Sequence, residues 1–304
     1  MIFCVTLIFI LCLTKIYSQV NWINQFTSPQ GNPLYQGTCN NGFIQSPIDV
    51  NNQNSYYNFS IGFVYENYSS ITTGLTMSDM YINVSNNTGL NIGNIILERY
   101  GYLSMYNLTD VRIKSPSEHT VNGVKGDMEI QLIHKKNIGQ YFTQNQNVPL
   151  PDANTYLGIS LIYTNSQSNN TDNGFAKDLI NAYKSGGKNL NLHSYQLTFG
   201  KKFYLYEGSE TNYPCDENFN WIVIADIFYI DQSSLSVVTS KYNEKFIGGT
   251  NVKSLAPLGY RPIYRNFKLD SNDNKVYVYP INSSTVSQVN LFVLFTIILI
   301  FLCL

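Results

Sequence analysis

Short apolar stretches separated by turn-forming residues restrict the fold of this chain more than any other feature. Val, Ile, Tyr, Phe and Thr gather in these stretches, and Asn, Gly and Ser lie between them, which is typical of β-strands. The expected strands are 75–85, 108–113, 128–134, 157–163, 202–206 and 221–229. Residues 174–185 place apolar side chains at helical spacing, and 233–245 forms a second expected helix capped by Ser233 or Ser234. We therefore predict a mainly β (α+β) fold, with a mostly antiparallel sheet and a few short surface helices.

Both ends of the chain are apolar. Residues 1–18 contain an apolar run too short to span a bilayer comfortably, which predicts a secretory signal peptide, with an N-terminal membrane anchor as the alternative. At the other end, a wholly apolar tail follows small residues and a short polar spacer. This pattern predicts a GPI-attachment signal at 283–304, with attachment at Asn282 or Ser283. A short C-terminal membrane segment is the alternative.

Between these ends, residues 19–282 contain no linker, charge block or repeat and are expected to form one domain. The secretory pathway would place it on the extracellular face of the plasma membrane, attached to the lipid bilayer through the GPI anchor. Only Cys39 and Cys215 remain in this segment. An even pair in an oxidising compartment predicts one disulfide, and two free buried thiols are the alternative.

Glycosylation sequons agree with secretion and predict a glycoprotein. The expected sites are Asn58, Asn67, Asn83, Asn86, Asn107 and Asn169. An Asn-rich chain also forms such triplets by chance, so not all of them are expected to carry a glycan. The chain has 19 basic and 20 acidic residues without a basic block, and we therefore predict no nucleic-acid partner.

Five motifs follow one another along the chain. They are G-T-C-N-N-G-F-I-Q-S-P-I-D-V at 37–50, S-P-S-E-H-T-V-N-G at 115–123, M-E-I-Q-L-I-H at 128–134, G-S-E-T-N-Y-P-C at 208–215 with W-I-V at 221–223, and Y-R-P-I at 260–263. In order, they resemble the Q-S-P-I-D-I, S-E-H-T, M-E-L-H-L-V-H, G-S-L-T-T-P-P-C with W-I-V, and N-x-R-P segments of the alpha carbonic anhydrases. The resemblance implies that family's fold, a large, twisted, mainly antiparallel central sheet with a conical cavity. It also implies the disulfide of secreted members, here Cys39 with Cys215.

Active members of that family hold zinc with three neutral histidines, leaving a fourth position for water. The resemblance places Arg112 and Lys114 at the first two ligand positions and Gln131 at the third. Only three histidines occur in the whole chain, and on a strand His134 would point away from the face that carries Gln131. We therefore predict no bound metal, no cofactor and no catalytic residues.

Other positions of the family's site differ as well. The resemblance places Leu90 at the proton-shuttle position, Asp110 at a glutamine that orients the first ligand, and Glu210 at an apolar wall residue. The family positions retained are Glu118, Glu129, Thr211 and Trp221. Packing and hydrogen bonding within the sheet would explain their presence without any catalytic role.

The two cations at the ligand positions carry a further expectation. If Arg112 and Lys114 point into the cone, they must be paired, because an isolated buried charge is very unfavourable. The candidate partners are Asp110, Glu118, Glu129 and Glu210. We expect a salt-bridge cluster in the place of the metal. In a variant of this hypothesis, the cations leave an anion pocket for bicarbonate.

These expectations favour a cell-surface pseudoenzyme, a non-catalytic binding or structural module whose partner is an unknown extracellular protein or glycan. One alternative is an active zinc carbonic anhydrase that hydrates CO2 with an unusual metal site. The second alternative is an anion- or bicarbonate-binding sensor.

Overall fold

The computed structural model describes residues 39, 42–71, 81–83, 93–99, 102–142, 154–166, 172, 174–184, 190–195, 201–245, 252–271 and 273. Both apolar ends lie outside these residues, as do the expected GPI sites Asn282 and Ser283. Leu90, Asn86 and Asn169 lie outside them too. Within the described residues, no helix is long and apolar enough to cross a membrane.

The described chain is mainly β, as predicted. Its strands are β1 Asp49–Val50, β2 Ser55–Tyr57, β3 Ile61–Glu66, β4 Ser70–Ile71, β5 Tyr81–Asn83, β6 Asn94–Arg99, β7 Tyr102–Lys114, β8 Thr120–Val121, β9 Val124–Lys125, β10 Met128–Phe142, β11 Tyr156–Thr164, β12 Leu190–Asn191, β13 Phe203–Gly208, β14 Phe219–Tyr229 and β15 Ile263–Arg265. The helices are α3 Phe175–Lys184, η1 Leu192–Ser194 (one 3-10 turn) and α4 Gln232–Lys245. Both predicted α-helices are thus confirmed.

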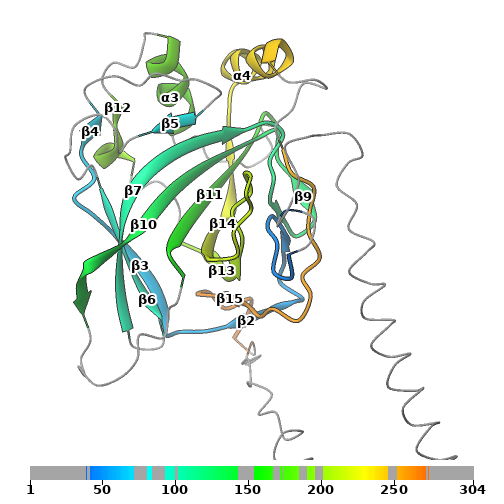
Figure 1. Cartoon of the computed structure of the whole chain (residues 1–304). Coiled ribbons are helices and arrows are strands. Elements are labelled where there is room, and N and C mark those ends of the chain that lie inside the picture. The colour runs from blue at the N-terminus through cyan, green and yellow to red at the C-terminus, as the bar shows by residue number, and fades with distance from the viewer. Residues whose placement is uncertain are drawn as a thin grey trace, which may run out of the picture.

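A ten-stranded sheet dominates the molecule and curls around one side of it (Figure 1). Its strands follow the order β2-β15-β13-β14-β11-β10-β7-β6-β3, and β5 also pairs with β7. The pairs β11–β14 and β15–β2 are parallel. The other pairs of this sheet are antiparallel. The prediction of a large, mostly antiparallel sheet is confirmed.

The two faces of the sheet pack against different partners. Along β14, Ile222 and Ile224 belong to an apolar core that also contains Leu179 of α3 and Val238 of α4. The alternate residue Trp221 belongs to a second apolar core. This alternation is what a strand buried on both faces requires. Residues of α3 and α4 therefore share the core on one face of β14, and the other face of the sheet carries the site described below.

Some boundaries differ from the sequence predictions. In α4 the cap is Asp231, because its carboxylate accepts a hydrogen bond from the backbone N–H of Ser234 at 2.8 Å. The two expected caps, Ser233 and Ser234, lie inside the first turn of the helix. Of the expected strand 75–85, the described part is β5. Strands β3 and β6, which pair with each other, were not predicted.

The predicted disulfide is present between Cys39 and Cys215, which are 176 residues apart in the sequence. It joins the beginning of the described chain to the loop between β13 and β14. We call this loop, residues 209–218, the β13–β14 loop. The loop carries the residues that contact the candidate site.

Candidate functional site

Strands β7 and β10 bring four polar side chains together on one face of the sheet. In their antiparallel register Arg112 is opposite Gln131, and Lys114 is opposite Glu129. Residues two apart on a strand share a face, so the four side chains are neighbours. All four residues are buried. Buried polar groups need partners, and each of the four has them.

Arg112 pairs with two carboxylates. Its Nη2 lies 2.7 Å from Glu210 Oε1 and 3.7 Å from Asp110 Oδ2. Burial raises the pKa of the Glu210 carboxyl above its ordinary value, and Arg112 opposes that shift. Asp110, which the resemblance placed at a ligand-orienting position, thus contributes to the neutralisation of Arg112. The predicted pairing of this cation is confirmed.

Lys114 is enclosed more completely than Arg112. Its Nζ lies 3.0 Å from Glu118 Oε1 and donates a hydrogen bond to Asn212 Oδ1 at 2.6 Å. Glu118 Oε1 also accepts from the backbone N–H of Lys253 at 2.9 Å. Together, Asp110, Arg112, Lys114, Glu118 and Glu210 form what we call the ion-pair cluster. The expected salt-bridge cluster is therefore present.

Gln131 connects the cluster to the retained family positions. Its Nε2 donates to Glu118 Oε2 at 2.9 Å and to Glu129 Oε1 at 3.0 Å. Its Oε1 accepts a hydrogen bond from Thr211 Oγ1 at 3.4 Å. The side-chain amide therefore bridges two carboxylates and one hydroxyl, and its donors and its acceptor are all engaged.

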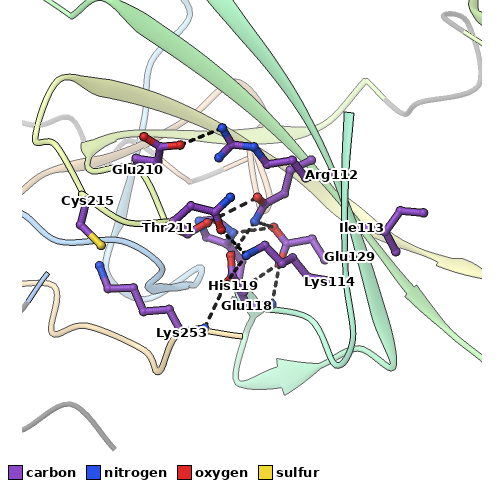
Figure 2. A network of polar contacts seen from close by, with 12 residues as sticks. Arg112, Ile113, Lys114, Glu118, His119, Glu129, Glu210, Thr211, Cys215 and Lys253 are labelled. Carbon is purple, nitrogen blue, oxygen red and sulfur yellow. Dashed lines mark hydrogen bonds and ion pairs between the residues drawn. The ribbon is translucent and has the colours of Figure 1, made fainter. Parts of the chain in front are cut away.

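Three successive residues of the β13–β14 loop each contact one of the three positions where the family's metal ligands were expected. Glu210 pairs with Arg112 (Figure 2). Thr211 bonds to Gln131, and Asn212 bonds to Lys114. At its base the loop is held by Trp221, whose Nε1 donates to the carbonyl of Ser209 at 2.8 Å. Asn212 was not predicted from the sequence. Its place in the fourth motif, directly after Thr211, was the signal that could have revealed it.

Glu129 has the structural role that the sequence allowed for it: it makes hydrogen bonds to neighbouring residues. Its Oε2 accepts hydrogen bonds from the backbone N–H groups of Glu118 and His119, at 2.7 and 2.8 Å. Its Oε1 lies 2.8 Å from His119 Nδ1. Burial alone would raise the pKa of Glu129, but His119 and these hydrogen bonds lower it to about 2. Glu129 therefore holds the turn after β7 against β10.

The histidines do not converge on the cluster. His134 points away from it and contacts Tyr68 and the carbonyl of Leu157, and burial lowers its pKa to about 3. His193 lies in η1. In the part of the chain that the structure describes, no group of three or more His, Cys, Asp or Glu residues is arranged to hold a metal ion.

The residues at the three family positions do not fit zinc. A guanidinium and an ammonium offer donors without a lone pair, whereas zinc takes neutral nitrogen, thiolate or carboxylate ligands. Arg112 and Lys114 are instead paired with the carboxylates of Glu210 and Glu118. Their positive charge would repel a dication at this place.

Four expected glycosylation sites lie in described segments. Asn67 is exposed and has a positive φ of 54°, whereas Asn58 is half-buried. Asn83 lies in β5. Asn107 lies in β7, paired with Asn94 of β6 and Lys135 of β10. Glycosylation at these residues stays a prediction.

Comparison with known proteins decides the family. The model of the eukaryotic-type carbonic anhydrase family matches residues 29–267. The chain belongs to this family. Its relatives include dioscorin DB3S of Dioscorea polystachya, 25% identical over 75% of this chain and 78% of the relative. Alpha carbonic anhydrase 4 of Arabidopsis thaliana is 26% identical over 71% of this chain and 72% of the relative.

Solved structures show the same carbonic anhydrase fold. A dioscorin complexed with ascorbate has a TM-score of 0.53 and 22% identity, over 79% of this chain and 92% of that one. The alpha carbonic anhydrase of Thermovibrio ammonificans, with the inhibitor sulfanilamide, has a TM-score of 0.52 and 19% identity, over 77% of this chain and 91% of that one. This carbonic anhydrase-family chain therefore has the family's fold around an ion-pair cluster.

Proposed function

We propose that this chain is a non-catalytic binding or structural module of the carbonic anhydrase family, displayed on the extracellular face of the plasma membrane. One observation carries the proposal. The three positions at which the resemblance expects zinc ligands hold Arg112, Lys114 and Gln131, and each is bound by a residue of the β13–β14 loop. The secretory signal, the GPI anchor and the glycans belong to the same proposal and rest on the sequence patterns.

The energetics of the ion-pair cluster support a loss of catalysis. Hydration of CO2 at a zinc ion needs three neutral ligands and a zinc-bound water whose pKa falls to about 7. Here the same volume contains two cations with their carboxylate partners. Removing one member of a buried pair leaves an uncompensated charge and costs about 3–5 kcal/mol. A metal ion could therefore not take the place of these ion pairs without that loss of stability.

The surface supports a recognition role. Phe43, Tyr213 and Tyr260 are 78%, 62% and 93% exposed. Aromatic side chains are enriched at protein–protein interfaces and among the residues that contribute most to binding. An extracellular protein or glycan is the class of partner that such side chains accommodate.

Metal content and catalysis on one sample test the proposal. We expect the full-length chain, purified in detergent from a eukaryotic secretory host supplied with zinc, to contain far less than one zinc per chain by mass spectrometry. Stopped-flow CO2 hydration should not exceed the buffer rate, and an active zinc carbonic anhydrase prepared in parallel serves as the positive control. Near-stoichiometric zinc together with hydration above background would overturn the proposal in favour of an active enzyme.

A further inference from the structure

Glu210 is the outermost member of the ion-pair cluster. Its side chain is 19% exposed, compared with 8% for Arg112 and 1% for Lys114. Arg112 sits on the long central strand β7, whereas Glu210 comes from the β13–β14 loop. The guanidinium is thus mounted on a rigid element, and the carboxylate reaches it from the solvent side.

The pairing of Arg112 with Glu210 is the same interaction that an external carboxylate would make. A guanidinium binds planar oxyanions through charge-assisted hydrogen bonds. Lys114 does not compete for this role, because Glu118 and Asn212 enclose it. Arg112 is therefore the cation of the cluster that an anion from solvent can approach.

Burial makes the ionised form of Glu210 easy to lose, because it raises the pKa of the carboxyl above its ordinary value. Arg112 opposes that shift, while the nearby carboxylates of Asp110 and Asp216 add to it. A modest fall in pH therefore neutralises Glu210 before an exposed glutamate would be neutralised.

We propose that Arg112 anchors a binding site for a small, planar, singly charged oxyanion, and that Glu210 occupies this site as an internal ligand. Neutralising Glu210 opens the site to an external anion of the carboxylate, bicarbonate or nitrate type. The inference rests on the proposed function in one respect. The cone must lack zinc, because a bound metal would recruit anions by itself.

The loop remains in place when Glu210 is released. Thr211 and Asn212 keep their own contacts with Gln131 and Lys114. The backbone N–H of Glu210 donates to the carbonyl of Asp216 at 3.0 Å. The disulfide at Cys215 and the contact between Trp221 and Ser209 hold the two ends of the loop. Release of one side chain therefore exposes Arg112 without unfolding the β13–β14 loop.

Nitrate is the probe of choice, because it is planar and does not titrate in the working range. We expect the full-length Glu210→Gln variant in detergent to bind nitrate at neutral pH, in isothermal titration at constant ionic strength, about tenfold or more tightly than the wild type. The wild type should gain affinity as the pH falls through the Glu210 pKa. Glu244→Gln is the matched control, because it removes the same charge from an exposed pair with Lys241 on α4. It should behave like the wild type.

Three outcomes would overturn the inference. In the first, the Glu210→Gln variant is folded by circular dichroism but shows no heat with nitrate at high millimolar concentration. In the second, nitrate binding by the wild type does not change with pH. In the third, Arg112→Gln in the Glu210→Gln background leaves nitrate binding intact. If Glu210→Gln fails to fold, the wild-type pH series decides. Zinc measured on the same samples separates the two proposals. Anion binding that follows zinc content contradicts the proposed function, whereas zinc-free protein without binding contradicts this inference alone.

Discussion

At the scale of single residues, ion pairs and hydrogen bonds occupy the positions where the resemblance expects metal ligands. Arg112, Lys114 and Gln131 would each be costly alone in a buried place, and each has a specific partner. Buried ion pairs add little net stability compared with apolar residues of similar volume. The cluster is therefore weak evidence for high stability, but it makes every member dependent on the others.

Glu129 gives a residue-scale prediction that depends on pH. Its folded pKa of about 2 lies below the ordinary 4.5, so its stabilisation is complete above the unfolded value and is lost as the pH falls from 4.5 towards 2. That difference corresponds to roughly 3 kcal/mol. We expect Glu129→Gln to lower the free energy of unfolding by about that amount at neutral pH and to flatten its acid dependence. Denaturant titrations at neutral and acidic pH measure both effects, and parallel pH curves for variant and wild type would contradict the argument.

The sequence predicted much of this site because ordered motifs fix positions along the chain. Arg112 and Gln131 lie on the expected strands 108–113 and 128–134 and are opposite each other, whereas Lys114 lies one residue beyond the expected end of its strand. Asn212 and Lys253 were missed, because their roles arise from tertiary contacts. Lys253 reaches Gln45 Oε1 at 2.6 Å across 208 residues of sequence, and burial lowers its pKa to about 8. A local sequence pattern cannot predict a contact between residues so far apart in the chain.

At the scale of elements, the contact between β11 and β14 positions the loop that forms part of the site. Gly158 of β11 is opposite Trp221 of β14. A Cβ at Gly158 would lie 2.4 Å from Trp221 Cζ3, so a glycine is needed there for the indole to lie over the sheet. The same indole bonds to Ser209 at the base of the β13–β14 loop. The close approach of two strands thus positions the loop.

We therefore expect Gly158→Ala to destabilise the protein by about 1–3 kcal/mol through overpacking. Gly62→Ala in β3 is the matched control, because its Cβ would meet only Glu98 Oε2 at 3.8 Å. Denaturant unfolding of both variants compares the same chemical change in two strands. Equal, small losses would show that the indole moves aside without cost.

The sequence predicted the central strands better than the outer ones. β7, β10, β11 and β14 are long and buried on both faces, so their apolar residues form clear runs. β2 and β15 have three residues each, which is too short for a periodic signal. β3 and β6, which pair at the end of the sheet, contain the apolar runs 61–65 and 95–97 and could have been predicted from them. Both α-helices were predicted because their apolar spacing is local.

At the scale of the whole molecule, the fold does not determine which side chains lie at the centre of the site. Solved structures at 19% and 22% identity share the fold of this chain, while three buried side chains make ion pairs and hydrogen bonds at the positions where the resemblance expects zinc ligands. The fold follows from alternation and packing over many residues, so it tolerates such changes. The family could therefore be predicted from ordered motifs, but the partner of this chain depends on surface residues that no motif identifies.

The disulfide links the start of the described chain to the β13–β14 loop. A cross-link across 176 residues of sequence restricts the unfolded chain strongly. We expect the double variant Cys39→Ser/Cys215→Ser to lose roughly 2–5 kcal/mol of unfolding free energy. Cys215 lies three residues after Asn212, so backbone hydrogen exchange at Glu210, Thr211 and Asn212 should also accelerate. Wild-type protein in reductant is the control for the substitutions themselves and should show the same two changes. A double variant that unfolds at the wild-type denaturant concentration, with unchanged exchange in the loop, would mean that the loop's contacts with Arg112, Lys114 and Gln131 hold it without the cross-link.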